Sequence, residues 1–242
     1  MVRNVLLTGI SKGLGLETAK LLLKSDYHVF GISRTTTAEL NNLKKEFHDR
    51  LKLKQFDLSL SDKIKQEIFD DFIDLDTVLH GFVNNAAIAY DDIITNLQLE
   101  PLEKMYRVNV FSPMIISRNV IRNFLLHQTP GSIVHLSSIS VHTGYKGLAM
   151  YASTKGALEA FSKNAAREWG ERKVRSNCIV AGFMSSDMNA SLSEEQLSRI
   201  ARRTAMKELT NMSSVAHMVE FLLSDKAESI TGNSFFVDSG TI

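Results

Sequence analysis

Tyr151 and Lys155 are a pair of residues suited to acid–base chemistry. They lie four positions apart in a segment with helical periodicity, so their side chains share one helix face. A free tyrosine has a pKa near ~10, and lowering it to ~7 requires about 4 kcal/mol of differential stabilisation. A neighbouring ammonium group favours the phenolate. The spacing alone is a weak signal, because an amphipathic helix with a tyrosine near one end has the same pattern.

Ser138 is a third candidate, because it follows the predicted strand 132–137. Open α/β sheets bind their ligands beyond the carboxyl ends of the strands. A hydroxyl there could bond a substrate carbonyl and stabilise charge as the carbonyl becomes an alcohol. Ser137 is an alternative, as is simple capping of the strand end. Neither serine lies in a G-x-S-x-G turn or near a histidine–acid pair in the sequence, which disfavours a hydrolase.

A glycine-rich turn follows the first predicted strand and opens a helix, with the sequence Thr8-Gly9-Ile10-Ser11-Lys12-Gly13-Leu14-Gly15. Its G-x-x-x-G-x-G spacing differs from the G-x-G-x-x-G of the common dinucleotide fingerprint. Glycines permit close backbone approach, and a helix N-terminus offers free N–H groups to a pyrophosphate. A strand–helix turn without a ligand is the alternative. The position between a strand and a helix favours a dinucleotide site.

The end of the second predicted strand indicates which dinucleotide binds. NAD-binding folds usually have an acidic residue there, which bonds the ribose 2′-hydroxyl. This sequence has Ser33-Arg34 instead. Arg34 can bind a 2′-phosphate bidentately, and Lys12 adds a second positive charge. Both could be ordinary solvated cations, but together with the missing carboxylate they predict NADP(H). The positive nicotinamide of the oxidised cofactor would further favour a Tyr151 phenolate.

Short apolar segments alternate with helical ones along the whole chain, which is typical of a parallel sheet covered on both faces. The predicted strands are 5–8, 28–33, 51–56, 81–84, 132–137, 175–180 and 234–237, and the predicted helices lie near 14–25, 38–49, 60–73, 100–127, 151–170, 193–206 and 212–224. We therefore expect one α/β domain over residues 1–242, a doubly wound Rossmann-type fold with a seven-stranded parallel sheet. Pro113 is expected to kink the helix 100–127. The segment 184–212 is either a mobile lid or a surface excursion.

Composition excludes several classes of protein. The chain has 28 Lys and Arg against 27 Asp and Glu, which gives no electrostatic reason to bind nucleic acid or an anionic membrane. Cys178 is the single cysteine, so an internal disulfide and a multi-cysteine metal site are excluded, and a reducing compartment is favoured. The sequence shows no signal-peptide core and no apolar stretch near the ~20 residues that span a bilayer. We expect a cytoplasmic protein without a metal.

These features together resemble the short-chain dehydrogenases/reductases over essentially the whole length. The resemblance rests on five motifs in order, namely residues 8–15, Phe56-Asp57-Leu58, Asn84-Asn85-Ala86-Ala87, Asn109 within Val108-Asn109-Val110, and Ser138 with Tyr151 and Lys155. It implies that Tyr151 is the general acid in reduction and the base in oxidation, and that Ser138 orients the carbonyl. It also implies that Lys155 tunes Tyr151 and holds the nicotinamide ribose, and that Asn109 positions a water that relays protons to Lys155.

The implied sites follow from these motifs. The predicted catalytic residues are Asn109, Ser138, Tyr151 and Lys155, and the predicted substrate-binding residues are Ser138 and Tyr151. The predicted cofactor-binding residues are Gly9, Ile10, Ser11, Lys12, Gly13, Leu14, Gly15, Ser33, Arg34, Asp57, Leu58, Asn85, Ala86, Ala87, Tyr151, Lys155, Gly182 and Met184.

Three positions depart from the family pattern. Ala87 replaces the usual glycine. Ala181 stands where a proline is usual, which is expected to loosen the turn that holds the nicotinamide carboxamide. The turn 126–130 contains no Lys or Arg.

Within the family, the chain is most similar to the β-ketoacyl carrier-protein reductases. This implies NADPH-dependent reduction of a 3-oxoacyl thioester-like ketone, a place in fatty acid biosynthesis, an acyl carrier protein as a possible partner, and a homotetramer or homodimer. Arg167, Arg172 and Lys173 could supply the basic surface that such a partner requires, or could be a solvated helix end. A sugar, polyketide or other secondary-metabolite carbonyl is the alternative substrate. A non-catalytic cofactor-binding regulator is disfavoured, because Tyr151 and Lys155 are both present.

Overall fold

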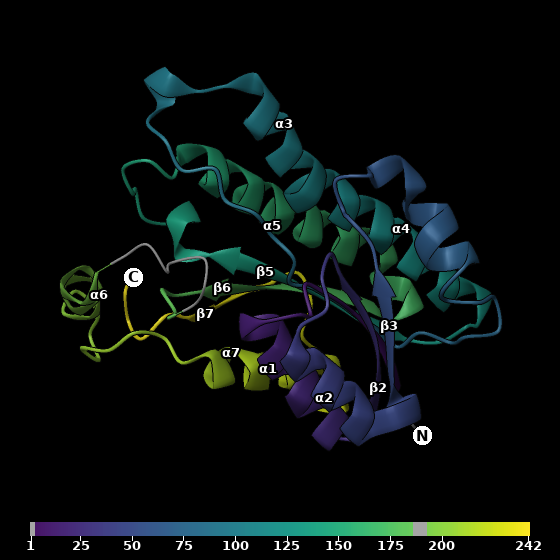
Figure 1. Cartoon of the computed structure of the whole chain (residues 1–242). Coiled ribbons are helices and arrows are strands. Elements are labelled where there is room, and N and C mark those ends of the chain that lie inside the picture. The colour runs from purple at the N-terminus through teal and green to yellow at the C-terminus, as the bar shows by residue number, and fades with distance from the viewer. Residues whose placement is uncertain (1–2, 186–192) are drawn as a thin grey trace.

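A seven-stranded parallel sheet forms the centre of the computed structural model, which describes residues 3–185 and 193–242 (Figure 1). The strand order is β3-β2-β1-β4-β5-β6-β7, so the predicted α/β fold with a parallel sheet is confirmed. The strands are β1 (Arg3–Thr8), β2 (Tyr27–Ser33), β3 (Leu51–Gln55), β4 (Gly81–Asn84), β5 (Gly131–Ser138), β6 (Val174–Ala181) and β7 (Ser234–Val237). The α-helices are α1 (Gly13–Lys24), α2 (Ala38–Phe47), α3 (Leu99–Tyr106), α4 (Ser112–Leu126), α5 (Ala149–Trp169), α6 (Glu194–Ala201) and α7 (Met212–Leu223).

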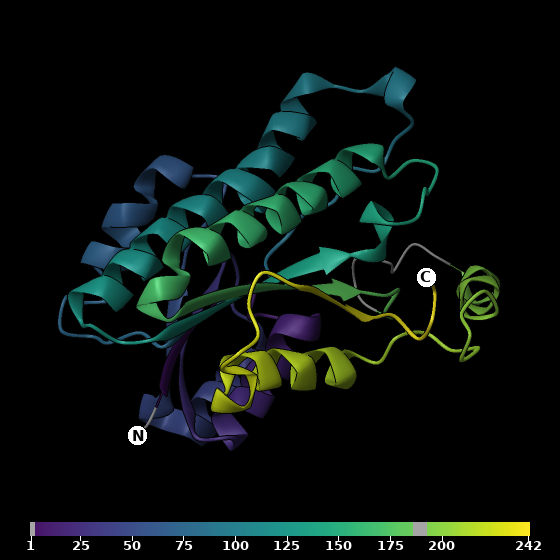
Figure 2. The ribbon, with the colours of Figure 1, turned by 180° about the vertical axis from the view of Figure 1, so that it is seen from behind.

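The central strands are apolar along their whole length because both of their faces are buried. Successive side chains of a strand point to opposite faces. In β1, Val5 and Leu7 therefore pack into one hydrophobic core, while Leu6 packs into the other. Helices α1, α2 and α7 cover the first face, and α4 and α5 cover the second (Figures 1 and 2).

The predicted helix 100–127 is interrupted before its proline. A π-helical turn, Arg107–Phe111, separates α3 from α4, and Pro113 lies in the first turn of α4. Proline lacks an N–H and its ring clashes with the carbonyl four residues earlier, so it is tolerated where a helix begins. The irregularity of the helix therefore lies at 107–111, upstream of Pro113, and consists of a π-helical turn.

The predicted helix near 60–73 is wrong as a regular α-helix. The structure has a 3-10 turn, Ser61–Lys63, followed by a π-helical turn, Lys65–Asp70. The backbone N–H of Ile73 bonds the carbonyl of Ile68, five residues earlier, at 2.8 Å. Both side chains, with Ile64, are buried in the core. The wider turn brings Ile73 onto the buried face. The spacing of the apolar residues is therefore close to that of an α-helix, although the backbone is not α-helical.

The site lies where the strand order reverses. The chain passes from β1 outward to β3 and then returns to β4 on the other side of β1. Loops leave the carboxyl ends of β1 and β4 in opposite directions there, which opens a ligand-binding crevice. Residues 186–192 of the segment 184–212, which the sequence left open between a lid and a surface excursion, fall outside the described residues. Within the described residues, no helix is both long and apolar enough to cross a membrane.

Candidate active site

A cavity of about 720 Å³ opens at the carboxyl ends of the strands. Eighteen of the twenty predicted site residues line this one space, although they come from distant parts of the sequence. The predicted residues that line it are Gly9, Ser11, Lys12, Gly13, Leu14, Gly15, Ser33, Arg34, Asp57, Leu58, Asn85, Ala86, Ala87, Ser138, Tyr151, Lys155, Gly182 and Met184. Two predicted residues, Ile10 and Asn109, do not line it: the side chain of Ile10 is buried in the hydrophobic core, and Asn109 lies behind the wall.

The glycine turn presents bare backbone to this cavity. A Cβ on Gly15 would lie 2.0 Å from the carbonyl oxygen of Gly9, and one on Gly9 would lie 2.7 Å from Nδ2 of Asn85. That amide donates to the carbonyls of Thr8 and Gly9, each at 3.1 Å, and so ties the turn to the loop after β4. A Cβ on Gly13 would meet no atom within 4 Å. The turn is therefore closed on the protein side and open toward the cavity, which fits a pyrophosphate at the N-terminus of α1.

The predicted phosphate-binding arginine, Arg34, lies at the opposite end of the cavity, beyond β2. Ser33 and Arg34 line the cavity, and the Arg34 carbonyl accepts a hydrogen bond of 2.8 Å from Nε2 of Gln55. Asp57 faces the same region. Burial tends to raise the pKa of its carboxyl, but hydrogen bonds from Ser59 and the charge of Arg34 outweigh burial and hold the pKa below its usual range. The residues at this end fit a ribose phosphate better than a bare ribose hydroxyl.

The structure distinguishes Ser138 from Ser137. The hydroxyl of Ser137 points to α5 and donates to the carboxylate of Glu159. The oxygen of Ser138 accepts from the backbone N–H of Ser140 at 3.2 Å and from the Ser140 hydroxyl at 3.0 Å. A serine hydroxyl has two acceptor positions and one donor. Both acceptor positions of Ser138 are used, so its proton is free to be donated to a group in the cavity.

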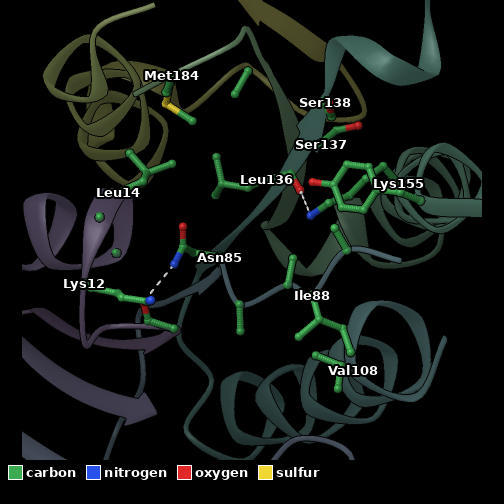
Figure 3. A pocket seen from close by; sticks show the side chains of 18 of the residues that line it. Lys12, Leu14, Asn85, Ile88, Val108, Leu136, Ser137, Ser138, Lys155 and Met184 are labelled. Carbon is green, nitrogen blue, oxygen red and sulfur yellow. Dashed lines mark hydrogen bonds between the residues drawn. The ribbon is translucent and has the colours of Figure 1, made fainter. Parts of the chain in front are cut away.

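Lys155 is buried, and β5 holds its ammonium group. Nζ donates to the carbonyl of Leu136 at 2.8 Å (Figure 3). It lies 5.6 Å from the centre of the Tyr151 ring. Burial lowers the pKa of Lys155 to about 8. Its side chain is only 3% exposed, so its charge is poorly solvated.

Tyr151 differs from the expectation of a lowered pKa. Burial, together with the negative charge of Asp91, raises the pKa of its phenol above the ordinary value in the protein alone. Desolvation penalises the charged phenolate, and the negative charge of Asp91 adds to that penalty. Tyr151 is therefore a neutral phenol at physiological pH, which is the form that can donate a proton.

Asn109 acts as a link between the loop after β4 and the catalytic helix. Its Oδ1 accepts from the N–H of Ile88 at 2.9 Å, and its Nδ2 donates to the Ile88 carbonyl at 2.8 Å and to Oγ1 of Thr154 at 3.1 Å. The Thr154 hydroxyl in turn donates to the carbonyl of Tyr151 at 2.7 Å. Asn109 thus helps to position the first turn of α5, and its role in a water relay stays a prediction.

The turn after β6 is held more firmly than Ala181 suggests. Gly182 donates its N–H to the carbonyl of Val237 at 2.9 Å, and the N–H of Thr210 bonds the carbonyl of Phe183 at 2.9 Å. A Cβ on Gly182 would lie 2.1 Å from the Thr210 hydroxyl oxygen. Close packing against the segment before α7 supports the turn in place of proline.

Sequence reasoning missed two charged residues that line the cavity, Asp91 and Arg203. Asp91 follows the Asn84–Ala87 motif by a few residues, and Arg203 follows α6. Neither belongs to a motif, and solvated loop positions with such side chains are common. Only the fold shows that both line the cavity.

Comparison with known proteins agrees with this architecture. A family model described as Enoyl-(Acyl carrier protein) reductase matches residues 9–241. Carbonyl reductase (NADPH) 2 of Sus scrofa is 32% identical and covers 98% of this chain and 95% of its own. The 3-oxoacyl-(acyl-carrier-protein) reductase FabG of Aquifex aeolicus is 29% identical, with 97% and 95% covered. A solved structure of 4-hydroxyisoleucine dehydrogenase complexed with NADH aligns at a TM-score of 0.90 and 26% identity, covering 99% of this chain and 98% of its own.

The fold and the matches define an oxidoreductase that acts on carbonyls or alcohols with a nicotinamide dinucleotide. The chain belongs to the short-chain dehydrogenase/reductase family. The predicted cofactor, NADP(H), agrees with the Sus scrofa relative, which is named for NADPH.

Proposed function

We propose that this chain reduces a ketone to the hydroxy compound with NADPH, with Tyr151 as the general acid. The observation that carries the proposal is the meeting of three groups at the end of β5: a neutral buried phenol, a serine hydroxyl with a free proton, and a buried ammonium. All three line one cavity together with the open glycine turn. This combination can bind a carbonyl oxygen and protonate it.

Each of these residues has a separate role in the proposed reaction. Arg34 and the backbone of the glycine turn would hold the phosphates of NADPH, and the cofactor supplies a hydride to the carbonyl carbon when bound. Ser138 donates a hydrogen bond to the carbonyl oxygen and stabilises the negative charge that develops on it. Tyr151 then transfers its phenolic proton to that oxygen. Lys155, close to the ring, lowers the cost of the phenolate that Tyr151 becomes.

For the substrate, we propose a 3-oxoacyl thioester-like ketone, which the Aquifex aeolicus relative supports by its name. A sugar or secondary-metabolite carbonyl is the alternative, favoured by the absence of Lys and Arg from the turn 126–130. An acyl carrier protein partner and assembly into a homodimer or homotetramer stay predictions of the resemblance.

The reductase function is tested by following NADPH consumption with acetoacetyl thioesters and simple diketones. We expect turnover of at least one ketone class. Tight NADPH binding without activity on any member of such a panel would contradict the proposal and favour a regulatory protein. Preference for the thioester over diketones of similar size would support the finer assignment.

Replacing Arg34 with alanine is expected to weaken NADPH binding by about 10- to 100-fold, the range for loss of a charge-assisted hydrogen bond. NADH binding should change by less than about twofold, because NADH has no 2′-phosphate. Cofactor fluorescence titration measures both. Arg50→Ala is a matched control, since Arg50 pairs with Asp26 away from the cavity. An equal loss for both cofactors would refute the 2′-phosphate contact.

A further inference from the structure

The cavity contains two charged side chains that the proposed reaction does not use, Asp91 and Arg203. They come from different elements and have opposite charges. A cavity that binds only a neutral ketone has no need of either group. Their positions relative to Tyr151 indicate what further groups a substrate carries.

Arg203 lines the cavity from a segment that is bonded to the turn after β6 and to the C-terminal residues, not to the end of the cavity beyond β2. It follows α6, and the same segment continues to Thr210, whose N–H bonds the turn after β6. β6 pairs with β5, and Ala181 is directly opposite Ser138. Arg34, by contrast, follows β2, four strands away from β6 in the sheet order. The 2′-phosphate contact proposed for Arg34 therefore leaves Arg203 available for another anion.

The guanidinium of Arg203 is exposed to the cavity. Among residues 3–185 and 193–242, no carboxylate forms an ion pair with it. Its neighbour Arg202 differs, because it does not line the cavity and bonds the hydroxyl of Ser198 on α6 at 3.1 Å. An arginine that faces a cavity without a protein partner is suited to a carboxylate, which it can bind through two parallel hydrogen bonds.

Asp91 lines the same cavity and lies near enough to Tyr151 for its charge to raise the pKa of the phenol. The N–H of the next residue, Asp92, bonds the carbonyl of Gly147 at 3.0 Å and holds this loop against the segment that leads into α5. The charge of Asp91 raises the pKa of the Tyr151 phenol, and partial burial raises the pKa of the Asp91 carboxyl itself. A carboxylate here repels a substrate anion and accepts hydrogen bonds from hydroxyl groups.

We propose that the substrate is a hydroxylated oxo acid, whose carboxylate binds Arg203 and whose hydroxyl next to the reacting carbonyl donates to Asp91. The proposal rests on the ketone reductase function. For the substrate it favours the alternative of a sugar-like carbonyl over the 3-oxoacyl thioester, because a thioester has no free carboxylate to bind Arg203. The opposite charges fix the direction of binding, because the anionic end is drawn to Arg203 and excluded from the side of Asp91. A substrate held at both ends presents its carbonyl to Ser138 and Tyr151.

The carboxylate contact is tested by comparing kcat/KM for acetoacetate and levulinate with kcat/KM for their methyl esters. Wild-type protein should prefer at least one acid over its ester by about tenfold or more. Arg203→Ala should lower that acid-to-ester ratio by about 10- to 100-fold, and Arg203→Lys should restore part of it. Arg202→Ala is the matched control and should leave the ratio unchanged.

Three results would overturn the carboxylate contact. An unchanged ratio in Arg203→Ala would show that Arg203 does not bind the substrate carboxylate. A loss of NADPH affinity that equals the loss of kcat/KM would show that it binds the cofactor diphosphate. Wild-type turnover of diketones with no preference for the acids would reject this inference alone, whereas no turnover of any ketone would reject the reductase function.

The hydroxyl contact is tested with 5-hydroxylevulinate and levulinate, which differ only in a hydroxyl next to the carbonyl. Asp91→Asn should lower the preference for the hydroxylated acid by about tenfold, because the amide oxygen is a weaker acceptor than a carboxylate. Asp92→Asn is the control, since Asp92 does not line the cavity and bonds Asn96 at 3.1 Å. An equal preference in Asp91→Asn and wild type would refute the contact.

Discussion

Tyr151→Phe is expected to lower kcat for ketone reduction by about 10³-fold while NADPH affinity changes by less than about twofold. General acid catalysis contributes roughly 10²- to 10⁴-fold to a rate. The variant keeps the ring and loses only the hydroxyl, whose raised pKa keeps the proton available for transfer. Ser138 can still bind the carbonyl oxygen, but its hydroxyl is a far weaker acid than a phenol. Stopped-flow turnover and cofactor fluorescence titration measure the two quantities.

Tyr106→Phe is the matched control for this variant. The Tyr106 hydroxyl lies on α3 and is 2.9 Å from Oγ of Ser153 on α5, but Tyr106 does not line the cavity. Its removal takes a phenolic hydroxyl from the same helix neighbourhood without touching the proposed proton donor. If Tyr151→Phe retained more than about a tenth of wild-type kcat while Tyr106→Phe was normal, Tyr151 would not be the general acid.

The sequence was most informative where local pattern and tertiary structure agree. The predicted strand 5–8 becomes the carboxyl-terminal part of β1, because Val5, Leu6 and Leu7 face one core or the other. The same rule failed at 60–73, where Ile64, Ile68 and Ile73 have to reach one core and a wider helical turn achieves this. Apolar spacing shows which residues are buried, but it does not distinguish helical turns of different width.

The candidate site shows a similar limit. Motif order placed Ser138 and Lys155 in one cavity, because their positions follow from strand ends and a helix face. The choice between Ser138 and Ser137 depended on hydrogen bonds to Ser140 and Glu159, which no spacing rule supplies. The pKa of Tyr151 depends on burial. The sequence predicted a pKa lowered by Lys155 and the oxidised nicotinamide, whereas burial and the charge of Asp91 raise it in the protein without cofactor.

Lys155→Met is expected to stabilise the cofactor-free protein at pH 7 by about 2 kcal/mol while removing turnover. Burial lowers the pKa of this lysine from 10.5 to about 8, which corresponds to about 3 kcal/mol of destabilisation when the group is charged. Losing the hydrogen bond to the Leu136 carbonyl offsets about 1 kcal/mol of the stabilisation that comes from removing the charge. A methionine of similar length fills the space without a charge. Urea unfolding measures the change in the free energy of unfolding.

The pH dependence of this stabilisation separates burial of charge from a simple packing gain. Between pH 8 and 10.5 the unfolded chain binds more protons at Lys155 than the folded protein does, so wild-type stability rises with pH in this window. Below pH 8 both states are protonated and the full penalty remains; above 10.5 both are neutral and it is gone. The advantage of Lys155→Met should therefore be largest at pH 7 and shrink by pH 9.5.

Lys163→Met, at an exposed position of the same helix, should stay within about 0.5 kcal/mol of wild type at both pH values. A Lys155→Met protein less stable than wild type at pH 7 would show that the folded protein compensates the buried ammonium, and that its presence costs the fold nothing.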